Sequence, residues 1–145
     1  MRDRLPARFL IDLARRVGSG EIDLEALRDL GYDEARVRLL SPGKALGLGP
    51  KVVDCLLLFA FGKLEAFPID VWIARAILER YGSLLEPERL TQVRRAVAGG
   101  SLSASAYDAV ARRLREYFGP YGGYAQQLLY HHFRTKKPVE SDTLG

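Results

Sequence analysis

The stretch LGLGPKVVDC, residues 46–55, decides how the chain folds. Two glycines flank one apolar residue and a proline follows them, which is typical of a tight turn that leads into a helix. The segment DEARVRLL precedes the stretch, and the apolar run VVDCLLLFAF overlaps its end. We therefore predict two helices joined by a glycine hairpin at residues 46–51. The second helix carries apolar residues on all sides, which predicts that it is buried.

Helical periodicity continues along nearly the whole chain. It predicts further helices over residues 7–17, 21–32, 70–82, 87–97, 103–119 and 121–134. Asp70 is expected at an N-cap and Gly82 at the far end of the same helix. No strand pattern and no internal repeat is found. The sequence thus predicts an all-α fold, with one helical domain over residues 1–137 and a disordered tail over residues 138–145.

Composition narrows the possible functions. The chain has 145 residues, a formal net charge of +4 and 28% charged residues, which is compatible with a nucleic-acid partner without demanding one. Its longest apolar run is interrupted by Asp54 and is shorter than the roughly 20 residues of a membrane span. One cysteine excludes an internal disulfide and any four-cysteine metal site. We expect an intracellular protein of the cytoplasm or nucleoid, with no membrane contact, no metal and no cofactor. His131 and His132 are expected to face DNA or to lie at the surface, and not to bind a metal.

The hairpin glycines indicate an anion site. Gly47 and Gly49 have access to positive φ and leave neighbouring amides open, because no Cβ shields them. Pro50 suits the first position of the helix that follows. A cluster of N–H groups at a helix N-terminus binds phosphate, and such a hairpin can hold a DNA backbone without reading bases. A plain turn between two helices is the alternative.

Lys51 occupies an unusual position for a cation. The positive end of the helix dipole disfavours its ammonium form, and a neutral lysine is a nucleophile or Schiff-base former. The alternative is a surface lysine paired with Asp54, one turn along the helix. The motif AFPIDVW, residues 66–72, adds Asp70. Capping a helix is the commonest role for such an aspartate, but a carboxylate that faces Lys51 also stabilises a cation formed between the two.

LGLGPKVVDC, AFPIDVW and the stretch GPYGGYAQQLLYHHFR, residues 119–134, together resemble 8-oxoguanine DNA glycosylases of the helix-hairpin-helix/Gly-Pro-Asp superfamily. Nineteen positions separate Lys51 from Asp70, and the resemblance runs from about Ala7 to Arg134. It implies a helical bundle with a helix-hairpin-helix motif. It also implies a bifunctional enzyme of base excision repair that acts on double-stranded DNA containing 8-oxoguanine or abasic sites.

The resemblance assigns roles to individual residues. Lys51 matches the lysine that attacks the sugar C1′ and forms a Schiff base, after which β-elimination releases the 3′ phosphate. Asp70 matches the aspartate that stabilises positive charge on the sugar. Cys55 and Tyr130 match residues that pack on the two faces of a flipped base, and Gln126 matches the glutamine that hydrogen-bonds its Watson–Crick edge. Without the resemblance, Cys55 would be a small buried hydrophobe, and the other two would form an ordinary amphipathic helix face.

The chain also departs from the family. Relatives carry a substantial portion before the segment that matches ARFLIDLAR, so the N-terminal lobe is expected to be missing. Apolar surface left by that lobe predicts self-association or a partner chain in its place. Leu5-Pro6-Ala7-Arg8 stands where relatives tend to have Tyr-Arg-Ala-Arg. The segment SPGKALGLG, which leads to the hairpin, is a few residues longer than usual. Trp72 replaces a histidine that contacts phosphate in some relatives. A helix-hairpin-helix DNA-binding module without catalysis, or one that depends on a partner, therefore remains the alternative.

Overall fold

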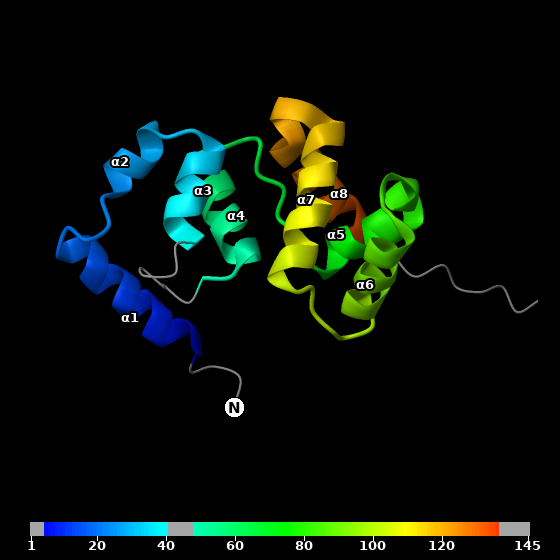
Figure 1. The fold of residues 1–145 in the computed structure, drawn as a ribbon, viewed down its shortest axis with the longest axis horizontal. Coiled ribbons are helices and arrows are strands. Elements are labelled where there is room, and N and C mark those ends of the chain that lie inside the picture. Colours follow the sequence, from blue (N-terminus) through cyan, green and yellow to red (C-terminus); the bar gives the residue numbers. More distant parts are fainter. Residues whose placement is uncertain (1–4, 41–47, 137–145) are drawn as a thin grey trace, which may run out of the picture.

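The chain folds into helices that fall into two groups (Figure 1). The computed structural model describes residues 5–40 and 48–136, with side-chain surroundings from residue 10 onward, and these ranges contain no strand. The helices are α1 (Leu5–Gly18), α2 (Leu24–Asp29), α3 (Tyr32–Leu40), α4 (Pro50–Phe59), α5 (Val71–Ala76), α6 (Pro87–Val97), α7 (Ala104–Phe118) and α8 (Gly122–Thr135). The expected all-α class is confirmed. Gly47 and the expected tail over residues 138–145 lie outside the described residues.

Local sequence signals set most of the helix boundaries. The side chain of Asp23 caps α2 by accepting from the Ala26 N–H, and Ser103 caps α7 in the same way. Pro50 and Pro87 stand at the first position of α4 and α6, where a missing N–H costs nothing. Gly119 ends α7 with φ of 71°, a conformation that side-chain-bearing residues rarely adopt.

Two helix predictions need correction. The predicted helix over residues 70–82 is α-helical only to Ala76; it continues as a π-helical turn, Ile77–Tyr81, and a 3₁₀ turn, Gly82–Leu84. Helix α4 is not buried on all sides, because Val52 and Phe59 are 49% and 63% exposed. The other face of α4 is buried and packs into the protein interior. Hydropathy alone could not distinguish that face, since both faces of α4 are apolar.

The interior consists of two apolar clusters. One joins α2, α3 and α4 through residues such as Leu27, Leu39 and Leu57. The other joins α5, α6, α7 and α8 and includes Phe67 and Leu114. In Figure 1 the segment between α4 and α5 runs from the first group of helices to the second. The boundary between the two clusters is therefore where the hairpin helix α4 meets the second group.

Helix α8 approaches the segment between α4 and α5 closely at Gly123. The Gly123 N–H donates to the carbonyl of Leu64 at 2.7 Å. A Cβ added at Gly123 would lie 2.4 Å from Leu58 Cδ1 and 3.0 Å from the Leu64 carbonyl oxygen. Only glycine fits this approach without a shift of the surrounding structure. The YGGYAQQ sequence therefore fixes α8 beside the chain that leads to Asp70.

Candidate active site

The N-terminus of α4 carries the hairpin lysine. Gly49 is the N-cap, no side chain caps this helix end, and Pro50 and then Lys51 follow. Gly49 has φ of −74° and ψ of 166°, so it does not use the positive φ that a glycine can adopt. A Cβ at Gly49 would nevertheless meet open space. The first-turn amides of α4 thus have no intrahelical acceptor and no capping side chain, which is the condition for holding an anion.

Asp54 does not pair with Lys51. It is completely buried, and its carboxylate accepts hydrogen bonds from the Tyr32 hydroxyl at 2.7 Å and from Arg36 Nε and the Tyr107 hydroxyl, both at 2.9 Å. Lys51 is exposed and forms no salt bridge with residues 10–40 or 48–136. The alternative of a surface Lys51–Asp54 pair is therefore overturned. Asp54 is directed into the interior of the protein, whereas Lys51 faces solvent.

Asp70 is fixed at the N-terminus of α5. Its Oδ1 accepts from the Ile73 N–H at 2.8 Å, so the predicted N-cap is confirmed. The residue is half-buried, and its backbone at φ of −102° and ψ of −173° is extended. One carboxylate oxygen is thus held by the backbone. A charge fixed in this way stabilises a developing cation without having to reorganise.

Lys51 and Asp70 line the same cleft, which has a volume of about 340 Å³. Its walls come from three places far apart in the sequence: residues 49–51 of the α4 turn, residues 69–71 before and at the start of α5, and residues 100–102 between α6 and α7. Tyr107 of α7 and the side chains of Ala74 and Ala96 complete the walls. The fold therefore brings Gly49, Lys51 and Asp70 to one solvent-accessible cleft.

Cys55 lies one helical turn beyond Lys51 on α4 and is half-buried. Burial raises the pKa of its thiol; the positive charge of Lys51 acts to lower that pKa, and the charges of Asp54 and Asp70 act to raise it. The net upward direction keeps the sulfur in its neutral form. Cys55 is consequently an uncharged packing group close to the cleft, and it does not itself line the cleft.

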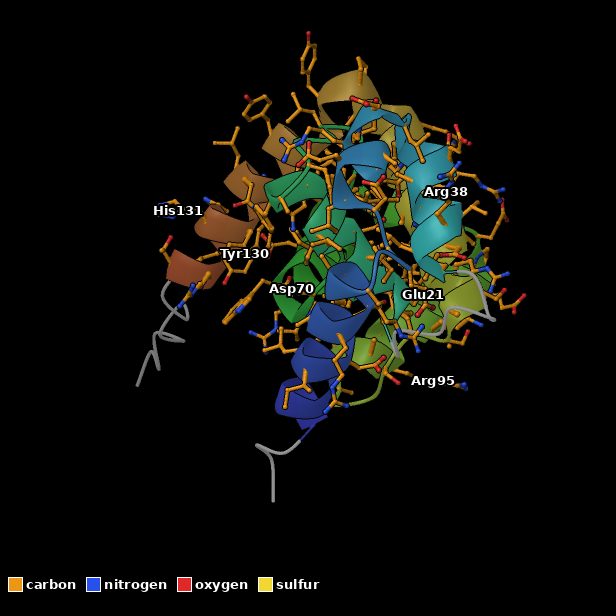
Figure 2. The ribbon with its side chains drawn as sticks, turned by 90° about the vertical axis from the view of Figure 1, so that its left-hand side faces the viewer. Glu21, Arg38, Asp70, Arg95, Tyr130 and His131 are labelled. Atoms are coloured by element: carbon orange, nitrogen blue, oxygen red, sulfur yellow. The ribbon has the colours of Figure 1, made fainter. Side chains whose placement is uncertain are left out.

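Gln126 and Tyr130 lie on α8, outside the cleft lining. Gln126 is 4% exposed; its Nε2 donates to the Pro68 carbonyl at 2.9 Å, and its Oε1 accepts from Gln127. Tyr130 is half-buried and its hydroxyl accepts from Arg134. Figure 2 shows Asp70 at the start of α5 and Tyr130 on α8. These two helices pack against each other. His131, also on α8, points outward, and His132 is likewise exposed. The described residues contain no group of three or more His, Cys, Asp or Glu side chains that could hold a metal.

Tyr107 and the connection over residues 100–102, which form one wall of the cleft, were not predicted from the sequence. The buried partners of Asp54 were not predicted either. A signal for Asp54 was present, because a lone carboxylate within VVDCLLLF needs buried partners. No comparable signal marks Tyr107, which occupies a buried position typical of any amphipathic helix.

Comparison with known proteins shows which class of protein the chain resembles. No family model matches the chain. A probable N-glycosylase/DNA lyase of Methanothermobacter thermautotrophicus is 40% identical over 50% of this chain and 27% of its own length. The N-glycosylase/DNA lyase OGG1 of Arabidopsis thaliana is 30% identical over 81% of this chain and 28% of its own. The class that these relatives define is that of the N-glycosylase/DNA lyases.

A solved structure agrees. The Clostridium acetobutylicum 8-oxoguanine glycosylase/lyase, in complex with double-stranded DNA containing cytosine opposite 8-oxoguanine, matches with a TM-score of 0.68 and 30% identity. The match covers 90% of this chain and 38% of that one. The chain is therefore homologous to the 8-oxoguanine glycosylase/lyase family, and it spans between about a quarter and two fifths of the length of these relatives. The homology confirms the resemblance recognised in the hairpin and the AFPIDVW motif. No helix in the described ranges is long and apolar enough to cross a membrane.

Proposed function

We propose that the chain is a bifunctional DNA glycosylase and abasic-site lyase that excises 8-oxoguanine from double-stranded DNA. The observation that carries the proposal is the shared cleft of Lys51 and Asp70, in which the lysine has no carboxylate partner among the described residues. An unpaired amine that faces solvent across from a fixed carboxylate suits attack on an electrophilic carbon. A merely structural lysine needs neither the cleft nor Asp70.

In the proposed reaction the target nucleotide leaves the base stack, because the duplex otherwise hides the sugar carbon. Lys51 Nζ forms a bond to C1′ as the bond between C1′ and the base breaks, and the base departs. Asp70 stabilises the positive charge that develops on the sugar. The sugar ring then opens: the C1′–O4′ bond breaks, O4′ takes a proton, and the electron pair on Nζ completes a Lys51–C1′ imine. The imine allows a proton to leave C2′, and the C3′–O bond breaks as the 3′ phosphate is eliminated with its electron pair.

DNA binding in this proposal rests on the α4 N-terminus and on charge. The open amides after Gly49 would donate hydrogen bonds to a backbone phosphate. The same role is proposed for Gly47, which lies outside the described residues. A net charge of +4 adds attraction that does not depend on sequence. Cys55, Gln126 and Tyr130 would contact the flipped base. For Gln126 this requires that its buried amide become accessible when DNA binds, while the Pro68 carbonyl holds the amide in one orientation.

Borohydride trapping tests the proposal directly. Wild-type protein is incubated with a duplex containing 8-oxoguanine opposite cytosine, and reduction should convert the imine into a stable protein–DNA adduct. Lys51→Gln should abolish the adduct, whereas Lys136→Gln, which removes an exposed lysine paired with Glu79, should not. Absence of an adduct with wild type, or an adduct that survives Lys51→Gln, would refute the enzymatic role.

The base-recognition residues need a separate test. Gln126→Ala should slow excision of 8-oxoguanine while cleavage at a preformed abasic site continues, because the second reaction involves no base. The abasic substrate also reports that the variant is folded. Equal loss on both substrates would mean that Gln126 acts only in packing.

A second candidate function is DNA binding through the hairpin without catalysis. The covered amide of Gln126, which the Pro68 carbonyl already holds, favours it. Such a module would bind duplex DNA with an affinity that falls with salt, show no preference for 8-oxoguanine and give no adduct.

A further inference from the structure

A buried polar network crosses the boundary between the two apolar clusters. At its centre, the carboxylate of Asp54 on α4 accepts from Tyr32 and Arg36 of α3 and from Tyr107 of α7. Arg36 also reaches Asp108 of α7 at 2.6 Å. Side chains from three helices thus meet on one fully buried carboxylate. The network ties α4, which bears Lys51, to α7 in the other group of helices.

The Tyr107 hydroxyl extends this network toward Asp70. It donates to Asp54 Oδ2 at 2.9 Å and accepts from the backbone N–H of Ile69 at 3.2 Å. Ile69 is 5% exposed and directly precedes Asp70. Two hydrogen bonds therefore connect the helix of Lys51 to the backbone beside Asp70, through the phenol oxygen of Tyr107, a residue that lines the cleft.

The chemistry of the phenol fixes the direction of both bonds. Burial, together with the negative charge of Asp54, raises the pKa of Tyr107 well above its ordinary value, although the Ile69 N–H acts to lower it. The phenol therefore keeps its proton, which goes to the carboxylate, and a lone pair remains for the Ile69 N–H. Tyr32 is equally buried and also donates to Asp54, but its hydroxyl makes no hydrogen bond to the described segment before α5.

We propose that Asp54 and Tyr107 are positioning residues, which hold Asp70 at its working distance from Lys51 across the cleft. This role rests on the proposed glycosylase and lyase function, since the spacing of the two groups matters only if both act on one sugar. A misplacement of about 1 Å can lower a rate by as much as about 100-fold. The alternative is that the network only stabilises the fold.

Two tyrosine variants separate these alternatives. Tyr107→Phe removes the hydroxyl that joins Asp54 to Ile69, and Tyr32→Phe removes a hydroxyl that joins Asp54 only to α3. Each variant keeps the ring and loses one donor to the same carboxylate. The measurements are the single-turnover rate of borohydride trapping on a duplex with an abasic site, the affinity for that duplex, and amide hydrogen exchange at Ile69.

We expect Tyr107→Phe to lower the trapping rate by about 10-fold or more while DNA affinity stays at the wild-type value. Exchange at Ile69 should become faster in the same variant. Tyr32→Phe should leave both the trapping rate and the exchange at Ile69 close to wild type, even if urea unfolding shows that the variant is less stable.

The positioning role would be overturned if the two variants had equal trapping rates, or if each variant lost rate only in proportion to its lost stability. In both cases the wild-type enzyme would still be active, so the proposed function would stand. Unchanged exchange at Ile69 in Tyr107→Phe would also overturn the positioning role, because the hydroxyl would then not hold the segment. A wild-type protein that forms no adduct at all would instead refute the proposed function, and the positioning role with it.

Discussion

Replacing Asp54 with asparagine should destabilise the protein more than any change to its surface charges. Asp54 is completely buried and accepts three side-chain hydrogen bonds, one of them from Arg36, which is 15% exposed. Asparagine keeps the shape but offers one acceptor oxygen instead of two and carries no charge. At least one of the Tyr32, Arg36 and Tyr107 donors then loses its acceptor. The partly buried Arg36 also loses one of its two counter-charges.

The magnitude follows from these contacts. Hydrogen bonds to a charged group contribute roughly 1.5–3 kcal/mol each, and breaking a buried ion pair by removing one partner costs about 3–5 kcal/mol. We therefore expect Asp54→Asn to lower the free energy of unfolding by about 3–5 kcal/mol. With a urea dependence of about 2 kcal/mol per molar, the unfolding midpoint falls by about 2 M.

Urea unfolding followed by circular dichroism measures this change, and Asp33→Asn is the matched control. Asp33 also pairs with an arginine, Arg115 at 3.2 Å, but its side chain is 86% exposed. Exposed pairs contribute about 0–1 kcal/mol, so the control should hardly move the midpoint. If both variants shift the midpoint equally at an unchanged slope, the Asp54 network does not stabilise the fold as described.

Two further predictions concern the close approach of α8 and the surroundings of Cys55. Gly123→Ala should lower stability by about 1–3 kcal/mol, because the new Cβ would press on the Leu64 carbonyl, whereas Gly18→Ala meets open space and should be neutral or slightly stabilising. Equal urea midpoints for the two alanine variants would contradict this packing. The raised pKa of the Cys55 thiol predicts that alkylation by iodoacetamide reaches half its maximal rate at a higher pH in the folded chain than in the urea-unfolded chain. Lys51→Gln removes the charge that lowers this pKa and should move the folded-state midpoint higher still; an unchanged or lower midpoint would contradict this effect of Lys51 on Cys55.

Sequence patterns predicted the parts of the site whose signals are local. Pro50 at the start of α4 and Asp70 at the cap of α5 depend on contacts within four residues, so the rules for helix ends located both. The juxtaposition of Lys51 and Asp70 across a cleft came from a resemblance and not from periodicity. The shared cleft agrees with that expectation, and the catalytic roles of the two residues remain predictions.

The remaining features depend on contacts between distant parts of the chain. The sequence shows that Asp54 is a lone carboxylate in an apolar helix, but it does not show that Tyr32 and Tyr107 of other helices are its partners. Both faces of α4 are apolar, so no pattern could tell which of them stays exposed at Phe59. The π-helical turn after α5 likewise has no signature in ILERY.

The polar network around Asp54 affects both the stability of the fold and the geometry of the cleft. A buried carboxylate is costly unless every oxygen is paired, and Asp54 is paired with groups that the fold must bring together from α3 and α7. The hydrogen-bonding groups of this network are all paired in only one arrangement of the two helix groups, so other arrangements are less stable. The geometry of the cleft is thereby linked to the stability of the fold.

The most direct test of the account is to identify the amine that becomes bonded to DNA. The reduced protein–DNA adduct is digested with protease and nuclease, and mass spectrometry locates the residue that carries the sugar remnant. The account predicts a single modified residue, Lys51, and a much slower yield of the same product in Asp70→Asn. A remnant on Lys44, on Lys63 or on the N-terminal amine would contradict it.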